Sequence, residues 1–158
     1  MARFSIPLPS TGANREVSHL DFGTRLGRHV NRRLRQEKII WLTTVDSENT
    51  PQPRPVWFHW DGENILIFSQ KDKAKLRHIS HNSRVSLNFN TDEDGGDVAV
   101  LICEAQIMDA PPDPSRVKTY LRKYREGIKE LGMTAQEFSD SYSVPIIVIP
   151  LSMRGFVE

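Results

Sequence analysis

The sequence has only one cysteine, Cys103, in 158 residues. A single thiol cannot form a disulfide within the chain, and its isolation excludes metal sites built on paired cysteines. A reducing compartment fits this composition best. No segment approaches the roughly 18 consecutive apolar residues that a membrane-spanning helix needs. Residues 1–17 also lack an apolar core of signal-peptide length. We therefore expect a cytoplasmic protein with no membrane partner.

Net charge is nearly absent as well. The chain has 21 Lys and Arg against 20 Asp and Glu, which leaves +1. Any binding of anions must therefore come from local clustering of cations. The 38% hydrophobic and 26% charged residues are typical of one globular domain. Prolines and a glycine interrupt residues 1–20, so we predict an N-terminal tail there and a single domain over residues 21–158.

The segment after this tail has the pattern of an amphipathic helix. Its apolar stripe consists of Phe22, Leu26, Val30 and Leu34. A second stripe at helical spacing consists of Arg25, Arg28, Arg32 and Arg35. These arginines suit either a nucleic-acid-binding helix or a solvated helix face. We favour the solvated face and expect no nucleic-acid partner, because no aromatic residue is interleaved and the rest of the chain is not basic.

From residue 38 onward the pattern changes to β-branched and aromatic segments separated by turn residues. We predict strands at 38–45, 54–60, 64–69, 84–89 and 98–110, with one or two more in 144–158. A short helix is expected at 73–80 and two helices in the insertion 113–142, where Thr134 and Glu137 form a capping-box pattern. Tight turns between strands indicate antiparallel pairing, and the series predicts a small, mainly β barrel with helices.

The turn between the third strand and the short helix gathers three lysines, Lys71, Lys73 and Lys75, shortly after Ser69. The first N–H groups of a helix have no internal partners, and the helix dipole favours an anion there. Lysine at this position opposes the dipole unless an anion is bound. The pattern therefore indicates a phosphate site. The alternative is a solvated turn in which Asp72 caps the helix.

A second unusual stretch is "PQPRPVWFHW", with three prolines in five residues. Prolines lack N–H donors, so this strand should lie at a sheet edge or beside a bulge. It presents a rigid backbone on which a flat ring can lie, with Arg54 available for an anion and Trp57 for stacking. The alternative is that the prolines only protect an edge strand from aggregation.

Motifs for other chemistries are missing. The sequence has no glycine-rich dinucleotide motif, no P-loop and no Gly-x-Ser-x-Gly elbow. His78 and His81 have no evident third ligand, and we predict no metal site. Cys103 lies in an apolar segment and is expected to be a buried hydrophobe. We predict no catalytic side chain, which suits a protein whose bound cofactor carries the reactivity.

The ordered series "IIWLTTVDSENTPQPRPVWFHWDGENILIFSQKDKAKLRHISHNSRVSLNF", with the later "GMTAQEFSDSYSVPI" and "RGF", resembles a known family. The sequence is similar to the pyridoxamine 5′-phosphate oxidase-like flavin and deazaflavin split-barrel superfamily, and most similar to its F-420-dependent branch. The resemblance covers about residues 30–157. It implies a six-stranded antiparallel split β-barrel that forms a homodimer, with a cofactor groove between the subunits.

The resemblance also assigns roles to residues. It implies that the cofactor phosphate is held after the third strand, with Arg54 as a further contact, and that Pro55, Val56 and Trp57 lie against the ring. Thr44 would approach the ring, and Arg154 and Phe156 would complete the site from either subunit. The expected cofactor-binding residues are Ser69, Gln70, Lys73, Lys75, Arg54, Pro55, Val56, Trp57 and Thr44.

The function implied is an oxidoreductase that uses F-420 to transfer hydride to a small electron-poor substrate. The alternative within the fold is an FMN-binding oxidase, flavin reductase or stress-related flavoprotein. A non-catalytic cofactor carrier or ligand-sensing module is the alternative from another class. F-420 carries an anionic oligoglutamate tail, and we expect the arginine stripe, at Arg28 and Arg32, to supply cations for it.

Overall fold

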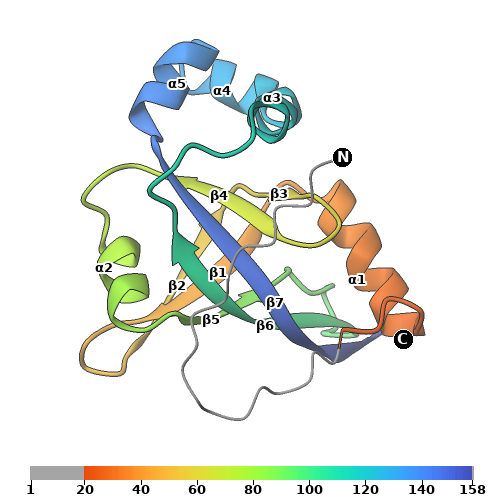
Figure 1. Cartoon of the computed structure of the whole chain (residues 1–158). Helices are drawn as coiled ribbons and strands as arrows, with labels where there is room; N and C mark the ends of the chain where they lie inside the picture. Colours follow the sequence, from red (N-terminus) through yellow and green to blue (C-terminus); the bar gives the residue numbers. More distant parts are fainter. Residues whose placement is uncertain (1–19, 158) are drawn as a thin grey trace.

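The computed structural model describes residues 20–157, which fold into one antiparallel sheet with five helices (Figure 1). The predicted tail, apart from residue 20, lies outside the described residues. The elements in chain order are α1 (Arg25–Gln36), β1 (Ile40–Val45), β2 (Pro51–Val56), β3 (His59–Trp60), β4 (Ile65–Ser69), α2 (Ala74–His81), β5 (Arg84–Asn88), β6 (Asp97–Ile107), α3 (Pro114–Lys123), α4 (Arg125–Glu130), α5 (Ala135–Ser141) and β7 (Val144–Val157).

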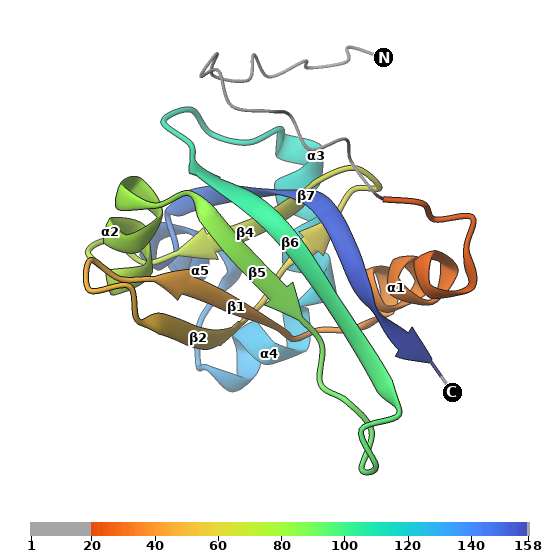
Figure 2. The same ribbon diagram turned by 90° about the horizontal axis from the view of Figure 1, so that it is seen from below.

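The seven strands are ordered β2-β1-β5-β6-β7-β4-β3, and every neighbouring pair is antiparallel. The sheet curls into a half-barrel, and the long strands β6 and β7 cross it diagonally (Figure 2). The helices α3, α4 and α5 form a layer at one end of the sheet (Figure 1). The predicted mainly β class with helices is confirmed.

The strand count differs from the six expected because the predicted strand 54–60 is interrupted. Its residues belong to β2, which begins at Pro51 and not at residue 54 as predicted, and to β3, and these two strands lie at opposite edges of the sheet. The interruption falls at Trp57 and Phe58. The Phe58 N–H donates to the Tyr124 hydroxyl at 2.8 Å, and the Phe58 ring is fully buried in the core. At this point the backbone of Phe58 therefore bonds to a side chain between α3 and α4 and not to a neighbouring strand.

The proline-rich strand lies at an edge, as predicted. β2 is the terminal strand of the sheet and pairs only with β1. Alternate residues of a strand direct their N–H groups to the same side. Because the prolines at 51, 53 and 55 alternate along β2, their missing N–H groups fall on one side of the strand, and Gln52 and Arg54, which pair with β1, keep their N–H donors.

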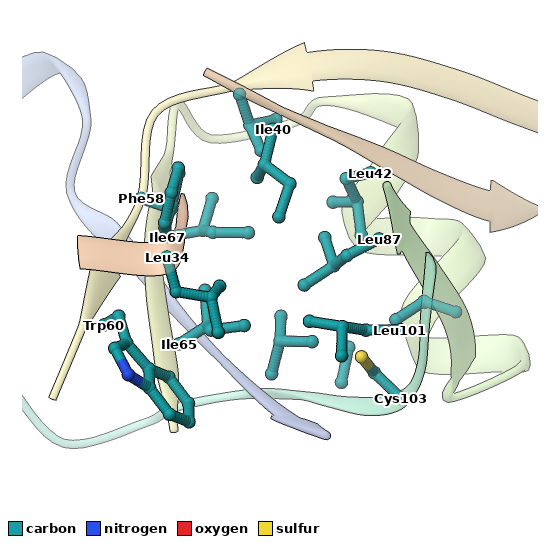
Figure 3. Close-up of a cluster of buried hydrophobic side chains, with 14 of the residues drawn as sticks. Leu34, Ile40, Leu42, Phe58, Trp60, Ile65, Ile67, Leu87, Leu101 and Cys103 are labelled. Carbon is teal, nitrogen blue, oxygen red and sulfur yellow. The ribbon is translucent and has the colours of Figure 1, made fainter. Parts of the chain in front are cut away.

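The main core lies between the curled sheet and α1 (Figure 3). Val30 and Leu34 of the predicted apolar stripe are at most 1% exposed, and Phe22 and Leu26 pack against the same cluster. Cys103 is fully buried there, and burial raises the pKa of its thiol to about 12. The four arginines of the second stripe are all exposed, as expected for a solvated face.

A second, smaller core joins the helical layer to the sheet. It consists of Tyr120, Tyr124, Ile128 and Phe138. The predicted capping box of Thr134 and Glu137 is confirmed, and the Asp113 carboxylate accepts from the Ser115 N–H at 2.8 Å at the start of α3. The insertion contains three helices and not the two predicted, because the first predicted helix is interrupted at Tyr124, between α3 and α4. No helix within residues 20–157 is long and apolar enough to span a bilayer.

Candidate functional site

The lysine turn connects the end of β4 to the start of α2. Asp72 adopts a left-handed conformation with φ of 59°, which an aspartate tolerates better than most residues. This conformation makes Lys73, rather than Asp72, the N-cap residue, and no side chain caps the helix. The alternative in which Asp72 caps α2 is therefore wrong. The first N–H groups of α2 face the turn without a side-chain acceptor among residues 20–157.

Lys75 directs its amine back toward the end of β4. Its Nζ lies 3.5 Å from the Ser69 Oγ, and the Ser69 side chain is fully buried. The Ser69 hydroxyl donates to the Gln70 carbonyl at 2.9 Å. The lysine amine is thus held close to the turn that follows β4, where a bound anion would also meet the N–H groups of α2.

Three cations lie near one another at this turn, two at the start of α2 and one on β2. Burial lowers the pKa of Lys75, and the positive charges of Lys73 and Arg54 lower it further. No carboxylate among residues 20–157 raises the pKa of Lys75 to oppose these effects. Holding a half-buried amine beside two other cations costs free energy. A doubly charged anion would remove this cost.

Thr44 and Gln70 are tied to the helices that flank the turn. The Thr44 side chain is 2% exposed, and its hydroxyl shares a hydrogen bond of 2.8 Å with the His78 Nδ1 on α2. The Gln70 Nε2 donates to the Ser141 Oγ at 3.1 Å at the end of α5. His78 and Ser141 thus hold Thr44 and Gln70 in place. From the sequence His78 was considered only as a metal ligand, and Ser141 was not singled out. Ser141 is 71 residues from its partner, so no local pattern signals this pair.

The residues expected to lie against a ring differ in their exposure. Arg54 and Pro55 are exposed on β2, whereas the Val56 side chain is 9% exposed and belongs to the main core. The Trp57 ring stacks on Tyr124 with centroids 4.5 Å apart. In this conformation of the chain the indole therefore packs against the helical layer, and its stacking on a cofactor stays a prediction.

Two groups of residues expected near the cofactor lie elsewhere in the same chain. The end of β7, with the exposed residues Arg154 and Phe156, lies far from α2 in both views (Figures 1 and 2). The helix α1, with Arg28 and Arg32, is also at the opposite end of the sheet from α2. These residues can join the lysine turn only by way of a second subunit, which stays a prediction.

The family assignment rests on a sequence comparison that spans most of this site. A family model described as pyridoxamine 5′-phosphate oxidase matches residues 26–141, well over half of the chain. The chain belongs to this family. The match includes β1, β2, the lysine turn and the helical layer, so the family pattern covers every expected cofactor-binding residue.

Curated relatives are more distant. The pyridoxine/pyridoxamine 5′-phosphate oxidase of Photorhabdus laumondii is 28% identical over 65 residues, which are 40% of this chain and 30% of that enzyme. The alignment thus spans about a third of that relative's length. Activity and substrate cannot be transferred from so short an alignment.

Solved structures agree on the fold. A putative pyridoxamine 5′-phosphate oxidase from Listeria innocua superposes with a TM-score of 0.61 and 23% identity, covering 80% of this chain and 94% of that one. An F-420 reductase superposes with a TM-score of 0.57 and 22% identity, covering 78% of this chain and 94% of that one. The heme storage protein HutZ from Vibrio cholerae superposes with a TM-score of 0.63 and 16% identity, covering 85% of this chain and 98% of that one. These likenesses show the split-barrel fold, as predicted, and the neighbours differ in what their names say they do.

Proposed function

We propose that this chain is an oxidoreductase that binds a phosphorylated flavin or deazaflavin at the lysine turn, with F-420 as the cofactor and a small electron-poor organic molecule as the substrate. The observation that carries the proposal is the half-buried amine of Lys75, which is surrounded by other cations and has no carboxylate partner among the described residues. Membership of the pyridoxamine 5′-phosphate oxidase family supports the same conclusion.

The residues at the turn fit a phosphate group. Lys75 and Lys73 supply charge, the N–H groups of α2 supply oriented donors, and Arg54 approaches from β2. When bound, the cofactor supplies the hydride chemistry. The chain binds the phosphate, holds the ring along the rigid backbone of Pro55 and Val56, and excludes water. We assign no side-chain acid or base, and solvent or a bound water provides the proton.

FMN is the second candidate, and the family match favours it, because the matching family and its curated relatives are named as oxidases. FMN and F-420 share the phosphate end. They differ in the oligoglutamate tail of F-420, which requires additional cations. Because α1 lies far from α2 in one chain, we propose that a homodimer brings Arg28 and Arg32 of the second subunit to the tail.

A parallel titration tests the choice of cofactor. Protein stripped of cofactor is titrated with F-420 and with FMN while the fluorescence of its three tryptophans is followed. We expect F-420 to bind more tightly by about tenfold or more, because its additional carboxylates meet additional cations. Tighter binding of FMN would promote the flavoprotein alternative. Failure of both to bind would overturn the proposal.

Turnover distinguishes the enzyme from a non-catalytic carrier or sensor of the same cofactor. Reduced cofactor bound to the protein is mixed with a panel of quinones and activated alkenes, and its reoxidation is followed by absorbance. We expect reoxidation to be faster on the protein than free in solution. A cofactor that binds tightly but is not reoxidised faster would support the carrier instead.

The lowered pKa of Lys75 makes a prediction about pH. The anion is attracted by the protonated amine, so the association constant should be constant while the amine stays charged. The association constant should then fall as the pH rises through the lowered pKa of Lys75. This fall should begin at a lower pH than it would for a lysine with an ordinary pKa. In Lys75→Arg the decline should disappear, since arginine stays protonated. Titrating FMN at a series of alkaline pH values measures this; the same decline in both proteins would contradict it.

A further inference from the structure

The helical layer contains a groove on α3 and α4, separate from the lysine turn. Its volume is about 720 Å³. Val117, Leu121 and Met133 form part of its apolar floor, and each is only partly buried. Val117 and Leu121 are apolar residues of α3, but the neighbouring residue Tyr120 takes the buried position on this helix. Val117 and Leu121 therefore line a groove that the chain itself leaves open.

Four cations border this apolar floor, and no carboxylate among residues 20–157 lines it. The cations are Lys118, Arg122, Arg125 and Lys129. None of them forms an ion pair with a described residue. In a chain with a net charge of only +1, such a concentration of positive charge is a local feature. The groove thus has the charge of a surface that attracts anions.

The cations form a row, because α3 and α4 are nearly continuous. The Tyr124 N–H donates to the Tyr120 carbonyl at 3.2 Å, and the Ile128 N–H donates to the Tyr124 carbonyl at 2.9 Å. Spacings of four, three and four residues place the cations on one side of this helical segment. The row is about 16 Å long at a rise of about 1.5 Å per residue. One carboxylate or one phosphate cannot contact a row of this length.

We infer that this groove docks an acidic amphipathic peptide segment of a partner protein, one with carboxylates about one helical turn apart and apolar side chains between them. Apolar anchors fill the floor, and the carboxylates pair with the four cations. A flat bilayer surface fits less well, because the apolar side chains line a groove beside the cation row and do not project from the surface. This inference does not depend on the cofactor or the reaction.

The test uses the full-length protein and a fluorescent helical peptide of about 14 residues, long enough to cover the cation row. The peptide carries leucines at helical spacing and glutamates beside them, and a matched peptide has glutamine in place of every glutamate. Fluorescence anisotropy gives both dissociation constants. We expect the glutamate peptide to bind more tightly by about tenfold. Its affinity should fall between about 0.05 M and 0.5 M salt, because screening weakens charge pairing. Equal binding of both peptides would overturn the inference.

A pair of double variants locates the binding. Lys118→Glu with Arg122→Glu reverses two groove charges, and Arg25→Glu with Arg35→Glu reverses two exposed charges on α1. We expect the groove variant to bind the glutamate peptide at least about tenfold more weakly and the α1 variant to bind it like the wild type. All four positions are solvent-accessible, so both variants should melt like the wild type. Equal loss in the two variants would overturn the inference.

Two further outcomes would show that the groove binds something other than a peptide. Vesicles containing phosphatidylserine that bind the protein while the peptide does not would assign the groove to a membrane surface. Self-association that is abolished by the groove variant, again without peptide binding, would assign it to a second copy of this chain. Either result overturns the inference.

Discussion

Replacing Lys75 with alanine should weaken the binding of both FMN and F-420 by about tenfold to a hundredfold, which corresponds to the loss of one charged hydrogen bond of about 1.5–3 kcal/mol. The amine is half-buried beside Ser69, so solvent screens it less than the exposed lysines of the same turn. Both cofactors should lose affinity equally, because they share the phosphate end. Tryptophan fluorescence titrations of the variant and the wild type measure the two losses.

Lys71→Ala is the matched control. Lys71 is exposed in the same turn, and it is not among the residues expected to bind the cofactor. We expect this variant to bind both cofactors like the wild type. The same loss in both variants would mean that only the general positive potential of the turn matters, and unchanged binding in Lys75→Ala would refute the assignment of the site.

The stability of the cofactor-free protein separates a binding role of Lys75 from a structural one. Because its amine lies near two other cations and at the start of a helix, removing the charge relieves repulsion. Cofactor-free Lys75→Ala should therefore be at least as stable as the wild type in thermal unfolding. A clear loss of stability would indicate that the lysine supports the fold, with binding as a secondary effect.

Much of the fold could be predicted from the sequence because the signals are local. Alternating apolar residues predict the strands, the spacing of Phe22, Leu26, Val30 and Leu34 predicts α1, and capping residues mark the starts of α3 and α5. The lysine turn was also found locally, since an excess of like charge at the start of a helix is visible in a few residues. Local chemistry is therefore enough to propose the candidate site, and its role in cofactor binding stays a prediction.

The remainder depends on contacts between distant residues. At the break between β2 and β3, Phe58 bonds to Tyr124, which is 66 residues further along the chain. The pairing of Thr44 with His78 spans 34 residues. On α3, Tyr120 and Leu121 are adjacent apolar residues, and only the packing on Phe68 and Phe138 decides that Tyr120 turns inward. No periodicity distinguishes such choices, since both positions satisfy the same helical pattern.

Tyr124→Phe should lower the free energy of unfolding by about 2–3 kcal/mol, which is a large fraction of the stability of a domain. The Tyr124 hydroxyl accepts from the Phe58 N–H at 2.8 Å and lies 2.8 Å from the carbonyl oxygens of both Lys38 and Phe58. Burial raises the pKa of Tyr124, so the hydroxyl keeps its proton and donates to one carbonyl at a time. Phenylalanine preserves the stacking on Trp57 but leaves the buried Phe58 N–H without a partner.

Tyr142→Phe is the control for this substitution. Tyr142 stacks on Phe138 at 4.4 Å, and its hydroxyl makes no hydrogen bond with the described residues, so we expect a change within about 0.5 kcal/mol. Urea unfolding followed by circular dichroism measures both variants. A small effect of Tyr124→Phe would mean that water or a rearranged backbone satisfies Phe58 after the substitution. A large effect would identify this single hydroxyl as the contact that separates β2 from β3, and so as the reason that Arg54 and Pro55 lie on an open edge beside the lysine turn.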